Sequence, residues 1–377
     1  MTSQASVQKG SDHEVVLEVK GLKVSFHTYL GEVKALDGVD FEVKRGEVLG
    51  LVGESGCGKT VTALAIGGLL SDNARVEAGE ILLEGKDLLK ETKDELRQTR
   101  LRKVSFVFQD PMTFINPVLS VGSQIAEILE SDKGFQAELV EYRIAELARA
   151  ESKGRLTPAE VEEKRSLEGL TDKKLSKRSL RRLAKLRTLD YMRTVRLPDP
   201  ERVYNMYPFE LSGGMRQRVM IAMALVRRPK VLLADEITTA LDVTVQAQVL
   251  RLLADLRGKI DASVVLITHD LGVVSEICDR VVVMYAGNVV EIADVEELFA
   301  NPLHPYTQGL LASIPRPDVF AKEMKSISGS VPNLIFPPSG CRFHPRCPKR
   351  FERCPLTKPP LIEVKPGHRV ACLLYEG

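Results

Sequence analysis

The 377-residue sequence lacks any strong excess of charge, since 53 basic and 51 acidic side chains leave a net charge of +2. Bulk charge therefore marks the chain neither for nucleic acid nor for lipid. Long apolar runs are also missing. Those such as Ala262 to Thr268 are far shorter than the ~20 residues of a membrane helix, and residues 1–13 are polar, without the apolar core of a signal peptide. We therefore expect a cytosolic protein with a flexible N-terminus at 1–13, which reaches a membrane only through a partner.

Cysteine is scarce as well. Six cysteines in so long a chain do not make a disulfide scaffold, but four of them crowd into the C-terminal tail, at Cys341, Cys347, Cys354 and Cys372. In a reducing compartment such clustering favours a metal site. The spacing has neither the close cysteine pairs of common zinc modules nor the ferredoxin pattern. It permits four thiolates around a metal centre without choosing the metal.

The composition predicts a folded chain of two or three packed units, because 44% of the residues are apolar and 28% are charged. Residues 15–52 indicate short strands separated by turns at Gly21, Gly31, Gly38 and Gly46. The stretch 125–196 is helical and highly charged. We expect further strands at 47–52, 104–108, 231–234, 263–267 and 280–284, and helices at 61–70, 243–256 and 271–277. Their alternation in the second half is typical of a parallel sheet with crossover helices.

A glycine-rich segment, Gly53-Glu54-Ser55-Gly56-Cys57-Gly58-Lys59-Thr60, matches G-x-x-x-x-G-K-[ST] between a buried strand and a helix. Its glycines allow a tight turn whose N–H groups point inward, and the helix start adds roughly half a positive charge. We expect Lys59 to reach the β- and γ-phosphates of a nucleotide and the Thr60 hydroxyl to bind Mg²⁺. The expected nucleotide-binding residues are Gly53, Ser55, Gly56, Cys57, Gly58, Lys59, Thr60 and Val61. The alternative is an ordinary glycine turn.

An apolar strand at 231–234 ends in two carboxylates, Asp235 and Glu236. Such a pair can place an acid beside a Mg²⁺-nucleotide held on a neighbouring strand. We expect Asp235 to hold Mg²⁺ through water and Glu236 to polarise the attacking water, because phosphoryl transfer is catalysed by positioning and charge stabilisation. A solvated strand end is the alternative, and the phosphate loop favours the catalytic interpretation.

One further block, Leu211-Ser212-Gly213-Gly214-Met215-Arg216-Gln217-Arg218, resembles the signature of ABC-type ATPases. Other pieces follow the order of that family: Gln109 after a strand, Asp235-Glu236, Ala240-Leu241-Asp242 and Thr268-His269-Asp270. From about Val15 to Gly377 the chain is similar to the ATP-binding subunits of oligopeptide- and dipeptide-type importers. The subfamily markers are Phe108-Gln109-Asp110-Pro111-Met112, Tyr207-Pro208, His304-Pro305-Tyr306-Thr307 and the cysteine-bearing tail.

The resemblance implies that ATP and Mg²⁺ are bound between two ATPase domains arranged head to tail, one phosphate loop facing the other signature. A serine hydroxyl and bare glycine N–H groups suit a γ-phosphate across such an interface. The roles that it implies are catalytic for Glu236, His269 and Gln109, Mg²⁺-binding for Thr60, Gln109 and Asp235, dimer-loop for Asp242, contact with the opposite ATP for Leu211, Ser212, Gly213, Gly214 and Met215, and adenine stacking for Tyr29. Packing remains the alternative for the lone histidine and the lone aromatic.

The fold class implied by the resemblance is α/β: a RecA-like parallel-sheet core, an N-terminal antiparallel β subdomain, a helical subdomain and an irregular C-terminal cysteine-bearing domain. We expect the β subdomain and first part of the core at 14–110, the helical subdomain at 111–215, the second part of the core at 216–300 and the C-terminal domain at 301–377. The sequence departs from the family at Ile237, where proline is usual, and at Phe209, where histidine is common. Neither change removes a reacting group.

The helical region also contains a charged insert at about 131–200, longer than in the family, with 17 basic and 12 acidic side chains. Between Lys173 and Arg187 there are eight basic residues and no acid, while leucines fall on one side of a helical wheel. We favour a helical hairpin packed on the ATPase with a solvated cationic face. A basic helix lying at anionic lipid headgroups is the alternative.

For the cysteine tail, the resemblance favours a [4Fe–4S] cluster with a structural role, its negative charge offset by Arg342, Arg346, Lys349 and Arg350. Zinc is the alternative metal, and free thiols are the simplest interpretation.

Taken together, we expect an ATP-hydrolysing importer subunit, peripheral on the cytoplasmic face of the membrane. The implied partners are a second ABC ATPase subunit (a paralogue or a second copy), two transmembrane permease subunits and, indirectly, an extracytoplasmic solute-binding protein, with no nucleic acid. Oligopeptides or dipeptides are the expected cargo, and oligosaccharides or other solutes are the alternative. A non-transport ABC ATPase and a module that holds ATP without turnover are the rival functions.

Overall fold

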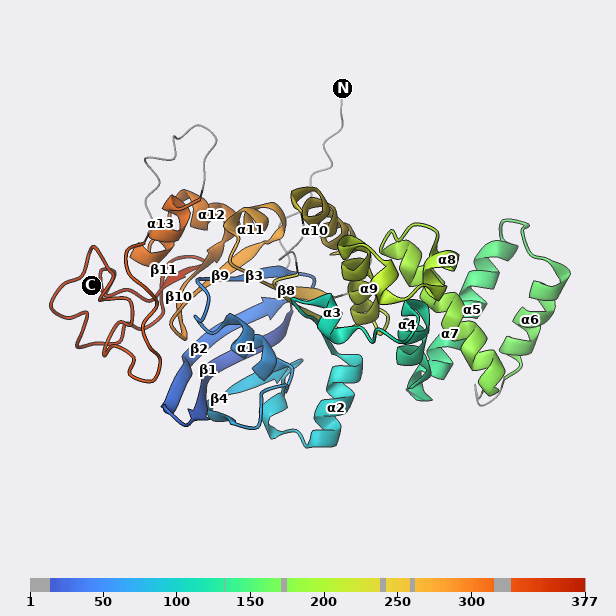
Figure 1. The fold of residues 1–377 in the computed structure, drawn as a ribbon, viewed down its shortest axis with the longest axis horizontal. Coiled ribbons are helices and arrows are strands. Elements are labelled where there is room, and N and C mark those ends of the chain that lie inside the picture. Colours follow the sequence, from blue (N-terminus) through green and yellow to red (C-terminus); the bar gives the residue numbers. More distant parts are fainter. Residues whose placement is uncertain are drawn as a thin grey trace, which may run out of the picture. The chain divides into compact units, whose positions relative to one another are not determined.

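The computed structural model describes residues 14–131, 133–170, 175–237, 242–257, 262–314 and 327–376. The chain forms two compact units (Figure 1). Unit 1 contains residues up to Val104, Lys230–Glu236 and the chain from Arg257 onward, whereas unit 2 contains Ser105–Pro229 and Ile237–Leu256. Among the helices of these described residues, none combines the length and the apolar composition needed to cross a bilayer.

The first sheet of unit 1 is antiparallel, with the order β2-β1-β4-β5. Its strands are β1 (Val15–Thr28), β2 (Gly31–Lys44), β4 (Ala74–Leu83) and β5 (Lys86–Asp87). The predicted turns at Gly21 and Gly38 are wrong, because both glycines lie inside continuous strands, where the register between β1 and β2 shifts. Their φ angles of +54° and +78° indicate why glycine stands there: each accommodates a bulge rather than a chain reversal.

The larger sheet has the order β11-β12-β10-β9-β3-β8-β7-β6. Its centre consists of β3 (Val48–Val52), β8 (Ser263–Thr268) and β7 (Val231–Asp235), which are parallel and buried at every residue. Near-continuous apolar runs are typical of parallel strands covered on both faces. β9 (Arg280–Tyr285) pairs with β3 on its other side, and β6 (Val104–Val107) is the strand in which unit 1 passes into unit 2.

Two strand regions of this sheet were not predicted. β10 (Asn288–Asp294) pairs antiparallel with β9, and β12 (His368–Val370) pairs with β10 and with β11 (Ile362–Lys365). The C-terminal segment therefore extends the sheet and also contributes the helix α13 (Pro305–Ala312). The prediction that the tail lacks regular elements is wrong in these stretches, although most of 327–361 is irregular as expected.

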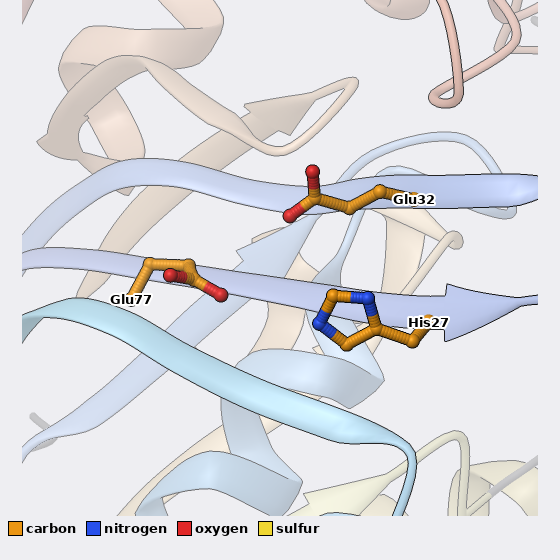
Figure 2. Close-up of side chains that lie close together, drawn as sticks. All are labelled: His27, Glu32 and Glu77. Atoms are coloured by element: carbon orange, nitrogen blue, oxygen red, sulfur yellow. The ribbon is translucent and has the colours of Figure 1, made fainter.

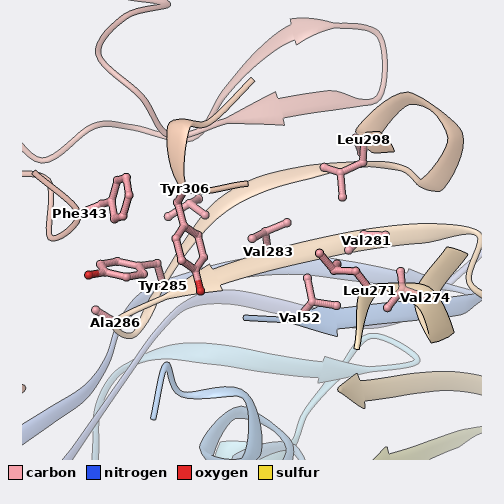
Figure 3. Packing of buried hydrophobic residues seen from close by; sticks show 12 residues of the cluster. Val52, Leu271, Val274, Val281, Val283, Tyr285, Ala286, Leu298, Tyr306 and Phe343 are labelled. Atoms are coloured by element: carbon pink, nitrogen blue, oxygen red, sulfur yellow. The ribbon is translucent and has the colours of Figure 1, made fainter. Parts of the chain in front are cut away.

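The helices of unit 1 cover its sheets. They are α1 (Lys59–Ile66), α2 (Lys93–Arg102), α11 (Leu271–Ile277), α12 (Val295–Ala300) and α13, with a 3₁₀ turn η1 at Leu88–Lys90. α11 packs on β3 and β8, and α12 packs on β9 and β10. A buried cluster joins strand valines such as Val52 and Val283 to Leu271, Tyr306 and Phe343 (Figure 3). Because Phe343 comes from the cysteine-bearing segment, that segment is part of the core of unit 1.

Unit 2 is helical. Its elements are α3 (Pro111–Phe114), α4 (Val121–Glu130), α5 (Lys133–Glu151), α6 (Pro158–Glu168), α7 (Lys177–Thr194), α8 (Pro200–Asn205), the 3₁₀ turn η2 (Pro208–Glu210), α9 (Gly213–Leu225) and α10 (Val243–Arg257). α4 packs against α7 and α8. An added Cβ at Gly122 would lie 2.2 Å from the ring of Tyr204, so glycine is what permits α4 and α8 to approach.

The charged insert forms α5, α6 and α7, and several of its charged side chains pair within unit 2. Arg143 makes two hydrogen bonds to Glu163, which also pairs with Arg182. The buried Arg187 lies over the ring of Tyr142, with its Cζ 3.8 Å from the centroid, and pairs with Asp190. In α7 the leucine face is turned inward, while Arg181, Arg182 and Lys185 are exposed. The hairpin interpretation predicted the exposed cationic residues, but the insert consists of three helices rather than a two-helix hairpin.

Candidate functional site

Strand register brings three loops of unit 1 to the same edge of the parallel sheet. Val52, the last residue of β3, pairs with Thr268, the last residue of β8, and Ile267 pairs with Asp235 at the end of β7. The segments that follow these strand ends are the phosphate loop, the His269 turn and Glu236. Ligands of open α/β sheets bind outside the carboxyl ends of the strands, which is where these segments meet.

The phosphate loop has a backbone that only glycine can adopt at its key positions. Gly53, Gly56 and Gly58 have φ angles of +149°, +79° and +104°. A Cβ at Gly53 would lie 2.2 Å from the carbonyl oxygen of Met284, and one at Gly58 would lie 2.6 Å from the Leu36 side chain. The loop is therefore fixed by close backbone packing, whereas Ser55 and Gly56 at its tip are exposed. The side chain of Cys57 is fully buried.

The loop presents a charge and free backbone donors. Lys59 is 5% exposed, and its Nζ donates to the carbonyl oxygens of Gly53 (2.8 Å) and Glu54 (3.1 Å). The N-cap of α1 is Gly58, which supplies no side chain to the first N–H groups of the helix. A helix start without a capping side chain, next to a buried lysine, is a site for a phosphate group.

Asp235 lies beside this loop in the environment expected of a metal-binding carboxylate. It is 6% exposed, and its Oδ1 has no hydrogen-bond partner. Burial raises the pKa of Asp235, while a hydrogen bond from the Thr60 side chain and the charge of Lys59 act to lower it. A buried carboxylate oxygen without a partner is costly unless a cation or water completes it. Asp235 and Thr60 thus fit the oxygen ligands that Mg²⁺ prefers.

Glu236 and His269 form the second polar pair of the site. Nδ1 of His269 lies 3.2 Å from Oε1 of Glu236, and the imidazole is 57% exposed. Glu236 has a φ of +46°, and its N–H donates to the carbonyl of Ile267 on the neighbouring strand. This left-handed turn directs the chain away from β7 immediately after Asp235. The exposure of His269 argues against the structural alternative for this residue.

The signature segment lies in unit 2, at the start of α9. Ser212 is the N-cap, and its Oγ accepts from the Met215 N–H at 3.4 Å. Ser212 and Gly213 are exposed, while Leu211 is buried and anchors the turn. An added Cβ at Gly214 would lie 2.5 Å from Val245 of α10, which explains that glycine by packing within unit 2.

The remaining predicted site residues lie in three other places. Gln109 is exposed after β6 in unit 2. Asp242 caps α10, accepting from the Val245 N–H at 3.0 Å, whereas Ala240 and Leu241 lie outside the described residues. Tyr29 is one of the two residues that join β1 to β2, and its side chain is 96% exposed. Packing is therefore excluded as the role of Tyr29.

The four tail cysteines gather in unit 1 as free thiols. Burial, together with the charges of Cys372, Cys347 and Cys354, raises the pKa of Cys341 to about 11. Among the described residues, however, no three of these sulfurs lie within 4.8 Å of one another. Four thiolates on one zinc ion would be about 3.8 Å apart, given Zn–S bonds of ~2.3 Å. The sulfurs therefore show no preformed ion- or cluster-binding arrangement.

Basic residues near the cysteines are used differently from the prediction. The charge of Lys349 does lower the pKa of Cys347 and of Cys372, although burial raises both overall. Arg342 instead pairs with Asp37, and Arg346 pairs with Glu54. The expectation that both arginines offset thiolate charge is therefore not supported, because each has a carboxylate partner elsewhere in unit 1.

A separate cluster of possible metal ligands lies on the antiparallel sheet. Ligand atoms of His27, Glu32 and Glu77, from β1, β2 and β4, lie within 4.8 Å of one another (Figure 2). All three residues are exposed, and Glu77 already accepts from the Ser25 hydroxyl at 2.9 Å. Nothing else at this cluster points to a bound ion.

Sequence reasoning missed the contacts that support the phosphate loop from the C-terminal segment. Glu54 donates its N–H to the Tyr306 hydroxyl, and its carboxylate pairs with Arg346. The partners are 252 and 292 residues away. Glu54 occupies a variable position of the motif, so only the subfamily marker around Tyr306 hinted that this region matters.

Comparison with known proteins finds two family models that match this chain. Residues 36–239 match the family model described as ABC transporter, and residues 290–354 match the one described as oligopeptide/dipeptide transporter, C-terminal region. The oligopeptide transport ATP-binding protein AppD of Bacillus subtilis is 45% identical over 96% of this chain and 97% of its own. The dipeptide transport ATP-binding protein DppD of Bacillus subtilis is 43% identical over 96% of both chains.

Similarity extends to another bacterium and to solved structures. The oligopeptide transport ATP-binding protein OppD of Escherichia coli is 42% identical over 95% of this chain and 93% of its own. The dimeric post-hydrolysis structure of the ATP-binding cassette MJ0796, bound to ADP and Pi, covers 74% of this chain and 98% of its own at 24% identity, with a TM-score of 0.55. It supports the fold alone. The chain therefore belongs to the ABC transporter family, among ATP-binding proteins that carry the oligopeptide/dipeptide transporter C-terminal region.

Proposed function

We propose that this chain is the ATP-hydrolysing subunit of an ABC importer for oligopeptides or dipeptides. The observation that carries this proposal is full-length similarity, above 40% identity, to three proteins named for oligopeptide or dipeptide transport. The site supplies the chemistry, since a phosphate loop, a buried carboxylate and a carboxylate–histidine pair stand at one edge of the sheet. As a member of this family the chain is a transport ATPase.

Within the site, each residue is proposed to act where its geometry suits it. The N–H groups from Gly56 to Thr60 and the side chain of Lys59 bind the phosphates, and Lys59 exchanges its carbonyl partners for phosphate oxygens. Thr60 and Asp235 hold Mg²⁺, with Gln109 as a further ligand and sensor. The ion neutralises charge that develops on the transferring phosphoryl group. Glu236 orients and polarises the attacking water, while His269 supports its carboxylate and contacts the γ-phosphate.

We also propose that catalysis needs two ATPase domains head to tail. Ser212 and Gly213 are exposed at the start of α9, in unit 2. Their N–H groups and the serine hydroxyl would bind the γ-phosphate held by the opposite subunit, and Asp242 would lie in the loop that crosses to it. Tyr29, exposed at its hairpin, would stack on adenine. The opposite subunit is a paralogue or a second copy.

For the four cysteines we propose a [4Fe–4S] cluster that stabilises the irregular part of 327–376 within unit 1. The support is indirect: four thiols from separate turns influence one another's ionisation. Iron and acid-labile sulfide analysis of anaerobically purified protein tests this, and absence of both would refute it.

The proposed partners follow from transport. Unit 2 exposes apolar side chains around two stacked aromatic pairs, Phe108–Phe114 and Tyr207–Phe209. Exposed apolar surface of this kind suits a protein partner, here two permease subunits, which would hold the ATPase at the cytoplasmic face of the membrane. An extracytoplasmic solute-binding protein would deliver the cargo.

The decisive experiment is purification of the chain with its permease subunits, reconstitution in proteoliposomes with the solute-binding protein, and measurement of uptake. We expect uptake of labelled oligopeptides or dipeptides that requires ATP on the ATPase side and stops in the Glu236→Gln assembly. Uptake of oligosaccharides instead of peptides would change the cargo. Co-purification with nucleic acid or ribosomes and without permease would contradict the transport function.

A further inference from the structure

Glu54, the second residue of the phosphate loop, is held through all three of its polar groups. Its N–H donates to the hydroxyl of Tyr306 at 2.8 Å, and its carbonyl oxygen accepts from Nζ of Lys59 at 3.1 Å. Its carboxylate accepts two hydrogen bonds from Arg346, at 2.7 and 3.0 Å. None of the catalytic roles above uses the contacts to Tyr306 and Arg346.

Tyr306 is a rigid support for this residue. It is fully buried in α13, where its ring packs against those of Tyr285 and Phe343 with centroids 4.7 and 5.3 Å away (Figure 3). Burial raises the pKa of the Tyr306 hydroxyl. The hydroxyl therefore stays protonated, and its oxygen accepts from the Glu54 N–H.

Arg346 is equally restrained. Its side chain is 6% exposed. Besides Glu54, the guanidinium donates to the Tyr285 hydroxyl at 3.3 Å and to three backbone carbonyls at 2.9, 3.3 and 3.2 Å, those of Ser328, Ile327 and Gly329. A fork–fork pair between arginine and carboxylate fixes direction as well as distance. The side chain thus connects the segment beginning at Ile327, which leads to the cysteines, with the phosphate loop.

We propose that Arg346 and Tyr306 are positioning residues of the nucleotide site, through Glu54. Between them they fix the turn at Gly53 and Glu54, whose carbonyls hold Lys59 before a nucleotide arrives. We call the contacts of Tyr306 and Arg346 with Glu54 the clamp. Because the clamp orders the loop and Lys59 in advance, a triphosphate binds without the cost of ordering them, and the affinity for ATP is higher. The C-terminal segment then belongs functionally to the ATP site. This inference rests on the proposed function only in taking a nucleotide as the ligand.

The charge of Glu54 allows the proposed contact with Arg346 to be distinguished from a purely electrostatic effect of the carboxylate on the nucleotide. A carboxylate in a phosphate-binding loop repels the ligand, so on electrostatics alone its removal strengthens ATP binding. The clamp predicts the opposite, because Glu54→Gln releases the arginine from the loop. If Glu54 and Arg346 acted on the nucleotide only through their charges, their opposite effects on ATP affinity would cancel in the double variant. If they act through one shared contact, either single change already removes that contact, so the two losses of affinity do not add.

The test compares Glu54→Gln, Arg346→Gln and the double variant in the full chain, using a fluorescent ATP analogue to measure dissociation constants. We expect each single variant to bind about tenfold more weakly, within the 5- to 150-fold range of typical couplings. The double variant should be no weaker than the weaker single variant. In the reconstituted assembly KM for ATP should rise while kcat changes less than about twofold, as expected for lost uniform binding.

Arg353→Gln is the matched control. Arg353 lies in the same segment and pairs with Glu376 at 2.8 Å, without contact to the loop, so this variant should bind ATP as the unaltered chain does. Tyr306→Phe, which keeps the packed ring and removes only the hydroxyl, supplies a second arm should Arg346→Gln fail to fold; it should also weaken binding. Unchanged or tighter ATP binding by Glu54→Gln would overturn the clamp. Absence of ATP binding by the unaltered chain would instead overturn the proposed function.

Discussion

Asp235 and Glu236 are adjacent carboxylates, yet the structure gives them different environments. Asp235 ends a buried strand and keeps an unpartnered oxygen beside Thr60. Glu236 adopts a left-handed backbone, φ +46°, and faces His269. A non-glycine residue in that region costs on the order of 1 kcal/mol, and such strain is retained where it places a functional group. One backbone turn therefore separates the carboxylate that we propose binds Mg²⁺ from the one that we propose orients water.

Glu236→Gln tests the role of the second carboxylate. Glutamine keeps the size and backbone contacts of Glu236 but cannot polarise water as an anion does, so ATP hydrolysis should fall on the order of 100-fold or more. ATP binding should persist because the phosphate loop is unaltered. Steady-state phosphate release and analogue binding measure the two effects. Hydrolysis at the original rate would remove Glu236 from its catalytic role.

His304 provides a pH prediction at the residue scale. It is fully buried, and burial lowers its pKa from 6.5 to about 3. The unfolded chain therefore binds a proton that the folded chain does not, so stability present above pH 6.5 is lost as the pH falls toward 3. At pH 5 this group alone should reduce the free energy of unfolding by on the order of 2 kcal/mol relative to neutral pH.

His304→Asn isolates that effect, because asparagine can still accept from the Tyr306 N–H that His304 Nδ1 now caps. Melting temperatures of the two chains between pH 5 and pH 7.5 should diverge on the acid side, with the asparagine variant declining less. Parallel curves would show that His304 takes up no proton on unfolding in this range.

At the scale of elements, helix packing in unit 2 depends on the absence of a side chain at Gly122. Gly122→Ala should lower the free energy of unfolding of unit 2 by about 1–3 kcal/mol, because the added Cβ meets the Tyr204 ring at 2.2 Å and overpacking outweighs the gain in helix propensity. Gly169→Ala is the control, since its Cβ would meet only ordinary contacts from 3.4 Å in an αR backbone. Equal thermal stability of both variants would contradict this reading of the α4–α8 contact.

The basic face of α7 carries a second prediction at this scale. Arg182 pairs with Glu163, and Nζ of Lys185 lies 4.9 Å from the centroid of the Tyr204 ring, so these cations already have protein partners. Changing Arg181, Arg182 and Lys185 to glutamine should leave sedimentation of the isolated subunit with anionic vesicles unchanged. Vesicles of neutral lipid provide the baseline. A clear loss of binding to the anionic vesicles would favour the lipid interpretation.

At the scale of the whole molecule, features that depend on residues close together in the sequence could be predicted, and features that depend on residues far apart in the sequence could not. Lys59, Asp235, Glu236 and His269 lie in local motifs, and parallel strands with apolar runs bring such motifs to one sheet edge. β10 was missed because its buried Glu291 reads as a surface residue. Its partner is His368, 2.7 Å away but 77 residues later.

The structural roles of two glycines could not be predicted from the sequence. Gly21 and Gly38 have the composition of turns, and only the pairing of β1 with β2 shows that they are bulges. The contact of Glu54 with Arg346 had no local pattern at all, since a glutamate in a variable loop position and an arginine near cysteines each have a simpler local explanation. Long-range polar pairs of this kind require the fold.

The phosphate loop lies in unit 1 and the signature segment in unit 2, and we propose that two ATPase domains complete each other's sites. A structure of the Glu236→Gln assembly with Mg²⁺ and ATP tests this most directly. It should contain a triphosphate bound by the loop around Gly58, with the serine and glycine of the opposite signature at hydrogen-bonding distance from its γ-phosphate, and Ser212 facing the nucleotide of the other subunit. A triphosphate held by one subunit alone, with both signature segments in solvent, would contradict the account.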